Sequence, residues 1–288
     1  MTPSRGLESD AGSEQAAGTR DILAGIGVPA EDLPVRERVS RAHIAALAGD
    51  APHLRIEGLV AGYGRMEILH DLDLQLGTAQ SLCLIGPNGA GKSTVLNAIY
   101  GFADIRRGSI VVDGRDITRQ PASAKLKEAG IAYVPQDPSV FPDLTVEQNL
   151  RLGGYLMQGK GEAKVAVERI FDQYPGIAER RREPARVLSG GERRLLEIAR
   201  ALMLDPQLLL MDEPSIGLEP RYVDMVFHML DDLQHREGKS ILMVEQNARK
   251  GLMFADLGYV LVAGQVVIAA TGDELLHDRS IGRLFLGE

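Results

Sequence analysis

The chain has 288 residues, of which 44% are hydrophobic and 25% are charged, and its formal net charge is −8. Length and composition are typical of a soluble globular protein with a sizeable core. The acidic balance argues against nucleic acid as a partner, because neutralising phosphates needs a surplus of Lys and Arg. No apolar run approaches ~18 residues and no signal pattern opens the chain, so we expect it to stay in the cytoplasm and not to span a membrane.

The first 50 residues differ from the rest. Up to Gly18 they are mostly Gly, Ser, Ala, Glu and Thr, a composition that cannot form a core, so we expect disorder there. Residues 35–47 have the spacing of one short amphipathic helix. We interpret residues 1–50 as an N-terminal extension, which is either a solvated appendage or an arm that docks on a partner.

Strand patterns follow from Leu54 onward. Residues 54–60, 68–76 and 109–113 are strand-like, and the second of them alternates leucines with polar residues. These segments predict a small antiparallel sheet. Between them, the apolar residues 81–85 predict a buried strand, and residues 94–100 predict a helix.

That strand and that helix are joined by the segment GPNGAGKST, which fits the pattern G-x-x-x-x-G-K-[ST]. The glycines let successive backbone N–H groups face inward as an anion nest at the start of the helix. Lys92 would reach the β- and γ-phosphates of a nucleotide, and the Ser93 hydroxyl would hold Mg²⁺. An ordinary glycine turn is the alternative for this segment taken alone. The expected nucleotide contacts are Gly86, Pro87, Asn88, Gly89, Ala90, Gly91, Lys92, Ser93 and Thr94.

The second half of the chain alternates apolar strands with helices. A strand at 131–134 precedes a helical insert at about 136–190, with helices at 145–157 and 163–174. Further helices are expected at 192–204, 222–236 and 248–255, and strands at 208–211, 240–244, 257–263 and 265–268. This alternation indicates an α/β fold with a mostly parallel sheet covered by helices on both faces.

Two adjacent carboxylates, Asp212 and Glu213, end the buried strand at 208–211. A strand end places them at the carboxyl edge of the sheet, where ligands of α/β proteins bind. Asp212 can orient Mg²⁺ or its waters, and Glu213 is placed to polarise an attacking water. The alternative is a pair of exposed loop acids.

A second candidate anion site lies at the segment LSGGE, residues 188–192, which opens the helix at 192–204. Ser189 is a natural helix cap, while Gly190 and Gly191 expose backbone N–H groups. A plain helix cap is the alternative for this segment alone.

Together these motifs resemble the ABC ATPase family, and the resemblance covers the chain from about residue 54 to its end. It identifies 86–94 as Walker A, Gln136 as the Q-loop glutamine, 188–191 as the signature and 208–212 as Walker B. It implies a P-loop NTPase core, an antiparallel β subdomain and the helical insert, with ATP and Mg²⁺ as ligands. It places Gln136 beside the metal and the attacking water, and it matches Tyr63 to the aromatic ring that stacks on adenine.

The resemblance also implies a head-to-tail dimer, in which Ser189, Gly190 and Gly191 of one subunit meet the ATP bound by the other. Two positions depart from the family pattern. The switch histidine is replaced by Gln246, which can donate a hydrogen bond to the γ-phosphate but carries no charge, so Glu213 must activate the water. Glu219 also stands where the loop after Walker B usually has Asp.

The segments 140–150, 215–220 and 244–247 look like those of the ATP-binding subunits of branched-chain amino acid, urea or amide importers. The resemblance therefore implies an ATPase at the cytoplasmic face of the membrane that works with permease subunits, a second ABC ATPase and, indirectly, a solute-binding protein. The two ATPase subunits could be identical or different. Two alternatives stay open: a soluble ABC ATPase acting in assembly or regulation, and a nucleotide-binding scaffold that does not hydrolyse ATP.

Overall fold

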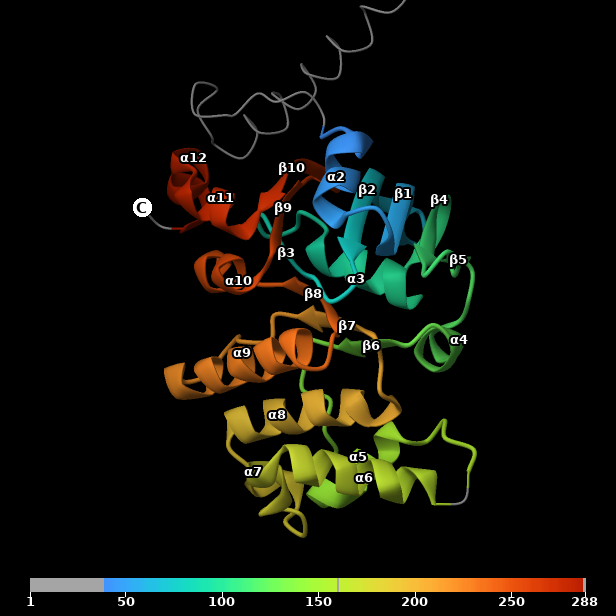
Figure 1. The fold of residues 1–288 in the computed structure, drawn as a ribbon, viewed down its shortest axis with the longest axis vertical. Coiled ribbons are helices and arrows are strands. Elements are labelled where there is room, and N and C mark those ends of the chain that lie inside the picture. The colour runs from blue at the N-terminus through green and yellow to red at the C-terminus, as the bar shows by residue number, and fades with distance from the viewer. Residues whose placement is uncertain (1–38, 160, 287–288) are drawn as a thin grey trace, which may run out of the picture.

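The computed structural model describes residues 39–159 and 161–286, and two sheets carry the fold (Figure 1). The larger sheet has the strand order β10-β9-β3-β8-β7-β6, and the smaller has the order β2-β1-β4-β5. The predicted α/β architecture is confirmed. No helix in the described part of the chain is long and apolar enough to cross a membrane.

The larger sheet is parallel except at one edge, where β10 runs antiparallel to β9. Strands β3, β7 and β8 are buried along their whole length, which explains their continuous apolar sequences. Parallel strands bring their carboxyl ends to a single edge, so the loops that follow β3, β7 and β8 meet there. The strands are β3 (Ser81–Ile85), β6 (Ile131–Val134), β7 (Leu208–Asp212), β8 (Ser240–Val244), β9 (Leu257–Val262) and β10 (Gln265–Thr271).

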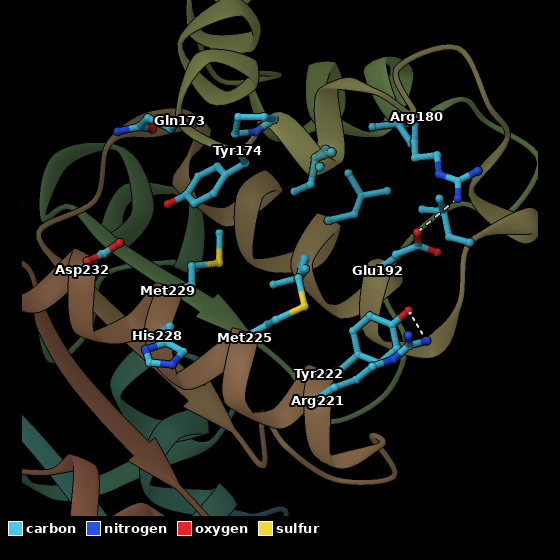
Figure 2. Close-up of a pocket in the computed structure, with 17 residues that line it drawn as sticks. Gln173, Tyr174, Arg180, Glu192, Arg221, Tyr222, Met225, His228, Met229 and Asp232 are labelled. Carbon is cyan, nitrogen blue, oxygen red and sulfur yellow. Dashed lines mark hydrogen bonds and ion pairs between the residues drawn. The ribbon is translucent and has the colours of Figure 1, made fainter.

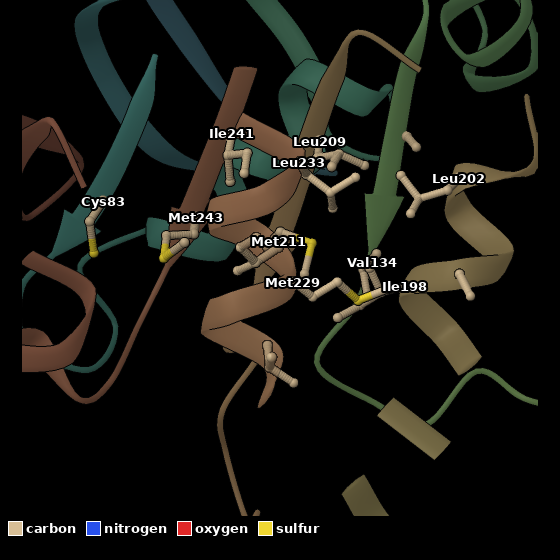
Figure 3. Close-up of a cluster of buried hydrophobic side chains, with 14 of the residues drawn as sticks. Cys83, Val134, Ile198, Leu202, Leu209, Met211, Met229, Leu233, Ile241 and Met243 are labelled. Atoms are coloured by element: carbon tan, nitrogen blue, oxygen red, sulfur yellow. The ribbon is translucent and has the colours of Figure 1, made fainter. Parts of the chain in front are cut away.

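Helices cover both faces of this sheet. Leu209 and Met211 of β7 point to the face covered by α8 and α9, where Ile198 and Met229 pack against them (Figure 3). Leu208 and Leu210 of the same strand belong to the core on the opposite face, together with apolar residues of α3. Because successive side chains of β7 point to opposite faces, α3 and α8 lie on opposite faces of the large sheet. The covering helices are α3 (Lys92–Tyr100), α8 (Gly190–Ala201), α9 (Pro220–His235) and α10 (Ala248–Phe254).

The antiparallel sheet packs on the α3 side and shares its core. Strand β4 begins at Asp104, five residues before the predicted start. The register between β1 and β4 is irregular between Glu57 and Val60, which breaks the simple alternation. The short elements β5 and α4 have no counterpart in the prediction. The elements are β1 (Pro52–Tyr63), β2 (Met66–Gly77), β4 (Asp104–Val112), β5 (Arg115–Asp116) and α4 (Ala122–Glu128).

The segment after β6 is helical and packs into the core on the α8 face through residues such as Leu150 and Ile170. Helix α5 has a capping box formed by Thr145 and Gln148. It ends at Gly153, not at the predicted residue 157. The elements are α5 (Val146–Gly153), α6 (Glu162–Gln173), α7 (Pro175–Ala178) and η1 (Ala185–Val187); η2 (Leu202–Leu204) follows α8, and α11 (Gly272–His277), α12 (Arg279–Ile281) and η3 (Gly282–Leu286) close the described chain.

Before β1, helix α2 (Arg41–Ala48) is docked on the fold. Ile44 is 1% exposed, and His43 Nε2 donates to the carbonyl of Ala269 in β10 at 2.8 Å. Arg41 Nε donates to Asp73 in β2 at 2.9 Å. The helix was expected at 35–47, and the disorder expected up to Gly18 lies outside the described residues. Residues 41–48 are thus tied to both sheets.

Candidate active site

The loop between β3 and α3, residues 86–91, has the backbone of an anion nest. Its glycines adopt conformations that other residues rarely take, with φ of 148° at Gly86, 79° at Gly89 and 99° at Gly91. Gly86 also has no room for a side chain, because a Cβ atom would lie 2.1 Å from the carbonyl oxygen of Leu261. These glycines let the loop close tightly at the N-terminus of α3, which attracts anions.

Lys92 begins α3 and folds back over this loop. Its Nζ donates to the carbonyl oxygens of Gly86 at 2.9 Å and Pro87 at 3.0 Å. The residue is 8% exposed, and this burial lowers the pKa of the ammonium group. The loop therefore carries one buried cation at the position where the phosphates of a nucleotide would lie.

Ser93 and Asp212 come from distant segments and meet at the carboxyl edge. Ser93 Oγ donates to Asp212 Oδ1 at 3.0 Å, and the Tyr133 hydroxyl donates to Oδ2 at 3.2 Å. Asp212 is 4% exposed, and burial raises its pKa. Such oxygen ligands suit a hard cation like Mg²⁺. The described residues contain no group of three or more His, Cys, Asp or Glu that could hold a metal, so phosphate oxygens and waters would complete this shell.

Glu213 lies next to Asp212 and has an unusual backbone. Its φ is 46°, the left-handed region, which costs a residue with a side chain about 1–2 kcal/mol. Its N–H donates to the carbonyl of Val244 at 2.9 Å, and its Oε2 accepts from Gln136 Nε2 at 3.1 Å. Burial, and then the charge of Asp212, raise the pKa of Glu213. This shift makes its carboxylate a stronger proton acceptor.

The residues after β8 are tied to the loop after β7. Gln246 is exposed, whereas its neighbour Glu245 is 2% exposed. The two carboxylate oxygens of Glu245 accept from the backbone N–H groups of Ser215 at 2.9 Å and Asn247 at 3.2 Å. One buried carboxylate thus joins the two loops.

The signature residues begin α8. Ser189 Oγ accepts from the backbone N–H of Glu192, and the Glu192 side chain accepts from the Ser189 N–H, so the two form a capping box. A second hydrogen bond of 2.8 Å joins Ser189 Oγ to the Tyr222 hydroxyl. Gly191 lies against the Tyr222 ring, because a Cβ atom there would be 1.9 Å from the ring carbon Cγ. Figure 2 shows Tyr222, with Arg221 stacked on it, at one end of a cavity of about 580 Å³ between α7, α8 and α9.

Tyr63 ends β1 and lies beside α3. Its side chain is 41% exposed, and its hydroxyl accepts from Asn97 Nδ2 at 2.8 Å. Asn97 belongs to the helix that follows the phosphate loop. An exposed aromatic ring at this position is available for stacking on a flat base.

The structure therefore separates the predicted site residues into two groups. Lys92, Ser93 and Asp212, with Glu213 and Gln136, gather at the carboxyl edge of the large sheet. Residues 189–191 lie at the start of α8, on the other face of that sheet from α3 (Figure 1). Among the described residues, no hydrogen bond joins them to the phosphate loop.

Sequence reasoning missed several residues that contact this site. Arg194 lies on the buried side of α8, three residues after Gly191 and four before Ile198, so a charge at a core position was its signal. Glu245 directly follows an apolar strand, as Glu213 does, which was a similar signal. The contacts of Tyr133, Asn97 and Tyr222 have no signal in the sequence, because they depend on the packing of distant segments.

Comparison with known proteins gives the class of this protein. Residues 69–216 match the ABC transporter family. The chain belongs to this family and is one of its ATP-binding, ATP-hydrolysing components.

Three relatives within the family are named as transport or export ATP-binding proteins. The chain is 39% identical over 225 residues to the high-affinity branched-chain amino acid transport ATP-binding protein BraG of Pseudomonas aeruginosa, covering 78% of this chain and 95% of that protein. It is 37% identical over 234 residues to the probable branched-chain amino acid transport ATP-binding protein LivF of Archaeoglobus fulgidus, covering 81% and 98%. It is 32% identical over 237 residues to the lipopolysaccharide export system ATP-binding protein LptB of Haemophilus influenzae, covering 82% and 97%.

Solved structures agree with this assignment. The crystal structure of the ADP conformation of an ATP-binding cassette of an ABC transporter has a TM-score of 0.73 and 27% identity, covering 83% of this chain and all of that chain.

Proposed function

We propose that this chain is the ATP-driven motor subunit of an importer for branched-chain amino acids or a related small amino acid or amide. The names of BraG and LivF support the solute class. The observation that carries the motor role is the separation of the signature residues from the phosphate loop within one chain. Each subunit then holds only part of the surroundings of each ATP and needs a second ATPase subunit, identical or related, to complete them.

In this proposal the phosphate loop binds the triphosphate, with Lys92 at the β- and γ-phosphates and Tyr63 against adenine. The partner subunit contributes the start of its α8, where Ser189, Gly190 and Gly191 face the γ-phosphate. ATP binding therefore closes the dimer, and loss of the γ-phosphate removes the group that both subunits hold.

Hydrolysis depends on the group at the carboxyl edge. Mg²⁺, held by Ser93 and Asp212 with Gln136 nearby, would neutralise the charge that develops on the phosphates. Glu213 takes a proton from the attacking water as its oxygen bonds to the γ-phosphorus and the bond to ADP breaks. Gln136 holds the Glu213 carboxylate, and Gln246 donates a hydrogen bond to the γ-phosphate.

A permease would dock in a groove beside this site. The groove has a volume of about 180 Å³ and lies between β6, α5 and α8. Tyr155 and Leu152 on its rim are 83% and 41% exposed, and Phe102 nearby is 57% exposed. Its lining includes Ser139, three residues after Gln136. A membrane subunit seated there would therefore contact the segment that carries Gln136. This contact would hold the chain at the cytoplasmic face of the membrane.

Isolation of the tagged chain from membranes of its own cells tests the proposal. We expect two membrane permeases to co-purify, along with a solute-binding protein for a branched-chain or amide solute. Tyr155→Glu should remove the permeases from the preparation. Val165→Glu, a matched change at a 71% exposed position of α6 outside the groove, should retain them.

Other results would contradict this function. Recovery of the chain with a lipopolysaccharide export complex would assign it to the class of its LptB relative. Recovery from the soluble fraction, without any permease, would favour an ABC ATPase that acts in assembly or regulation.

A further inference from the structure

We propose that Arg194 is a positioning residue that holds Glu213 and Gln136 in the geometry for hydrolysis. This inference rests on the role proposed above for Glu213. Arg194 lies on α8, one helical turn after the signature, and it belongs to none of the family motifs identified from the sequence.

Arg194 binds the backbone on both sides of Glu213. Its Nη2 donates to the carbonyl oxygen of Asp212 at 3.0 Å, and its Nε donates to that of Pro214 at 3.2 Å. Glu213, between them, has the left-handed φ of 46°. A guanidinium that bridges the two flanking carbonyls fixes the direction in which the Glu213 side chain leaves the strand.

The same guanidinium binds the segment that carries Gln136. Its Nη1 donates to the carbonyl oxygen of Pro135 at 2.8 Å. Its ion-pair partner, Glu197, accepts from the backbone N–H of Ser139 at 2.7 Å. Two side chains on α8 thus hold the backbone before and after Gln136, whose amide reaches Glu213.

The pair is buried, with 7% of the Arg194 side chain and 4% of the Glu197 side chain exposed, and its shortest separation is 3.0 Å. A buried ion pair is weak evidence for stability, because an apolar pair of similar size often serves equally well. An apolar pair, however, cannot replace the directed hydrogen bonds that Arg194 makes. The guanidinium uses four of its five N–H groups on three carbonyls and one carboxylate, and an ammonium group lacks this planar fork.

The position of Arg194 also couples the signature at the start of α8 to the carboxyl edge of the large sheet. Helix α8 begins with the residues that meet the partner's ATP, and five residues after Ser189 it holds the backbone at Asp212, Pro214 and Pro135. A shift of α8 against the sheet therefore moves the carbonyls that orient Glu213 and Gln136.

The test is steady-state ATP hydrolysis by the purified full chain, paired with the related ATPase subunit where that subunit completes its site. Arg194→Lys keeps the charge that pairs with Glu197 but loses the fork. A second variant, Arg194→Gln with Glu197→Gln, removes both charges and keeps polar groups in the same space. In both we expect kcat to fall roughly 10–100-fold, because a misplacement of about 1 Å costs this much, while KM for ATP stays within about twofold.

Two further measurements separate positioning from a structural role. Arg169→Lys is the matched control, because Arg169 also donates to backbone carbonyls, those of Leu202 and Met203, at the far end of α8. It should lower the melting temperature and leave kcat unchanged. In a Glu213→Gln background, adding Arg194→Lys should change the residual rate by less than about twofold, because Arg194 and Gln136 both act through the Glu213 carboxylate, which is no longer there to take the proton.

The outcomes are distinct. A kcat within about twofold of the parent for both folded Arg194 variants would overturn the inference and leave the role of Glu213 intact. A further fall in kcat of roughly 10–100-fold when Arg194→Lys is added to Glu213→Gln would also overturn it. A parental rate for Glu213→Gln alone would overturn the proposed role of Glu213, and the inference with it.

Discussion

Glu213 shows how one residue combines backbone, hydrogen bonding and charge. Its backbone is left-handed, its carboxylate accepts a hydrogen bond from Gln136, and burial, followed by the charge of Asp212, raises its pKa. The sequence predicted the carboxylate and the strand end. It could not predict the backbone conformation, which depends on carbonyls held by Arg194 and on the bond to Val244.

Replacing Glu213 by Gln should lower kcat about 10²–10⁴-fold, since an amide cannot accept the proton of the attacking water. ATP affinity should be retained, which equilibrium binding would measure. The raised pKa also predicts the pH profile. The base form of Glu213 is lost on acidification at a higher pH than the ~4.3 of an ordinary glutamate, so activity should fall on the acid side above that value.

The parental and variant pH profiles form the check. The fall in activity at acid pH (the acid limb of the profile) should be present in the parent and absent from the residual activity of Glu213→Gln. The same limb in both would assign the titration to another group.

Among the elements, α8 connects the signature to the sheet edge. It begins at the signature, lies against α9 through Tyr222, and reaches the sheet edge through Arg194. The sequence identified Ser189 as a helix cap, but it placed the start of the helix at residue 192, whereas α8 begins at Gly190. Its neighbours could not be predicted, because α9 and the loop after β7 follow later in the chain and meet α8 only in the folded protein.

Gly191→Ala tests the contact between α8 and α9. The added methyl group would lie 1.9 Å from Cγ of Tyr222, so either the ring or the start of the helix must move. We expect loss of ATP-dependent dimerisation, measured by light scattering, with ATP binding to the monomer retained.

Tyr222→Gly in the same chain removes Cγ, Cδ1 and Cβ, the three atoms that a Cβ at residue 191 would meet, and should restore dimerisation. A Gly191→Ala variant that dimerises like the parent would show that the start of α8 tolerates the shift and that this contact is not required.

At the scale of the whole molecule, one chain holds only part of the ATP site that we propose. The fold class followed from the alternation of apolar strands with helices, and it is confirmed. The ends of several elements were wrong by a few residues, as at β4 and α5, where an irregular register or a glycine interrupts the pattern. The spatial separation of residues 189–191 from the phosphate loop is a property of topology, which periodicity does not reveal.

This separation predicts the assembly state. With ATP and Mg²⁺, the Glu213→Gln chain, or its pair with a related ATPase subunit, should elute from a sizing column as a dimer, because ATP is bound but not removed. Adding Lys92→Ala should return it to monomer, since the buried cation of the phosphate loop is lost. A monomer under ATP in the first variant, with the subunit that completes it present, would contradict the shared site.

Glu245 couples the loop after β7 to the loop after β8. It is a buried anion with one oxygen on the loop after β7 and the other on the loop after β8. If either loop shifted alone, an oxygen of that anion would be left without a donor, at a substantial cost in free energy. In the proposed assembly the two loops would therefore rearrange together, so the departure of phosphate from Gln246 would accompany a rearrangement of the loop that holds Ser215.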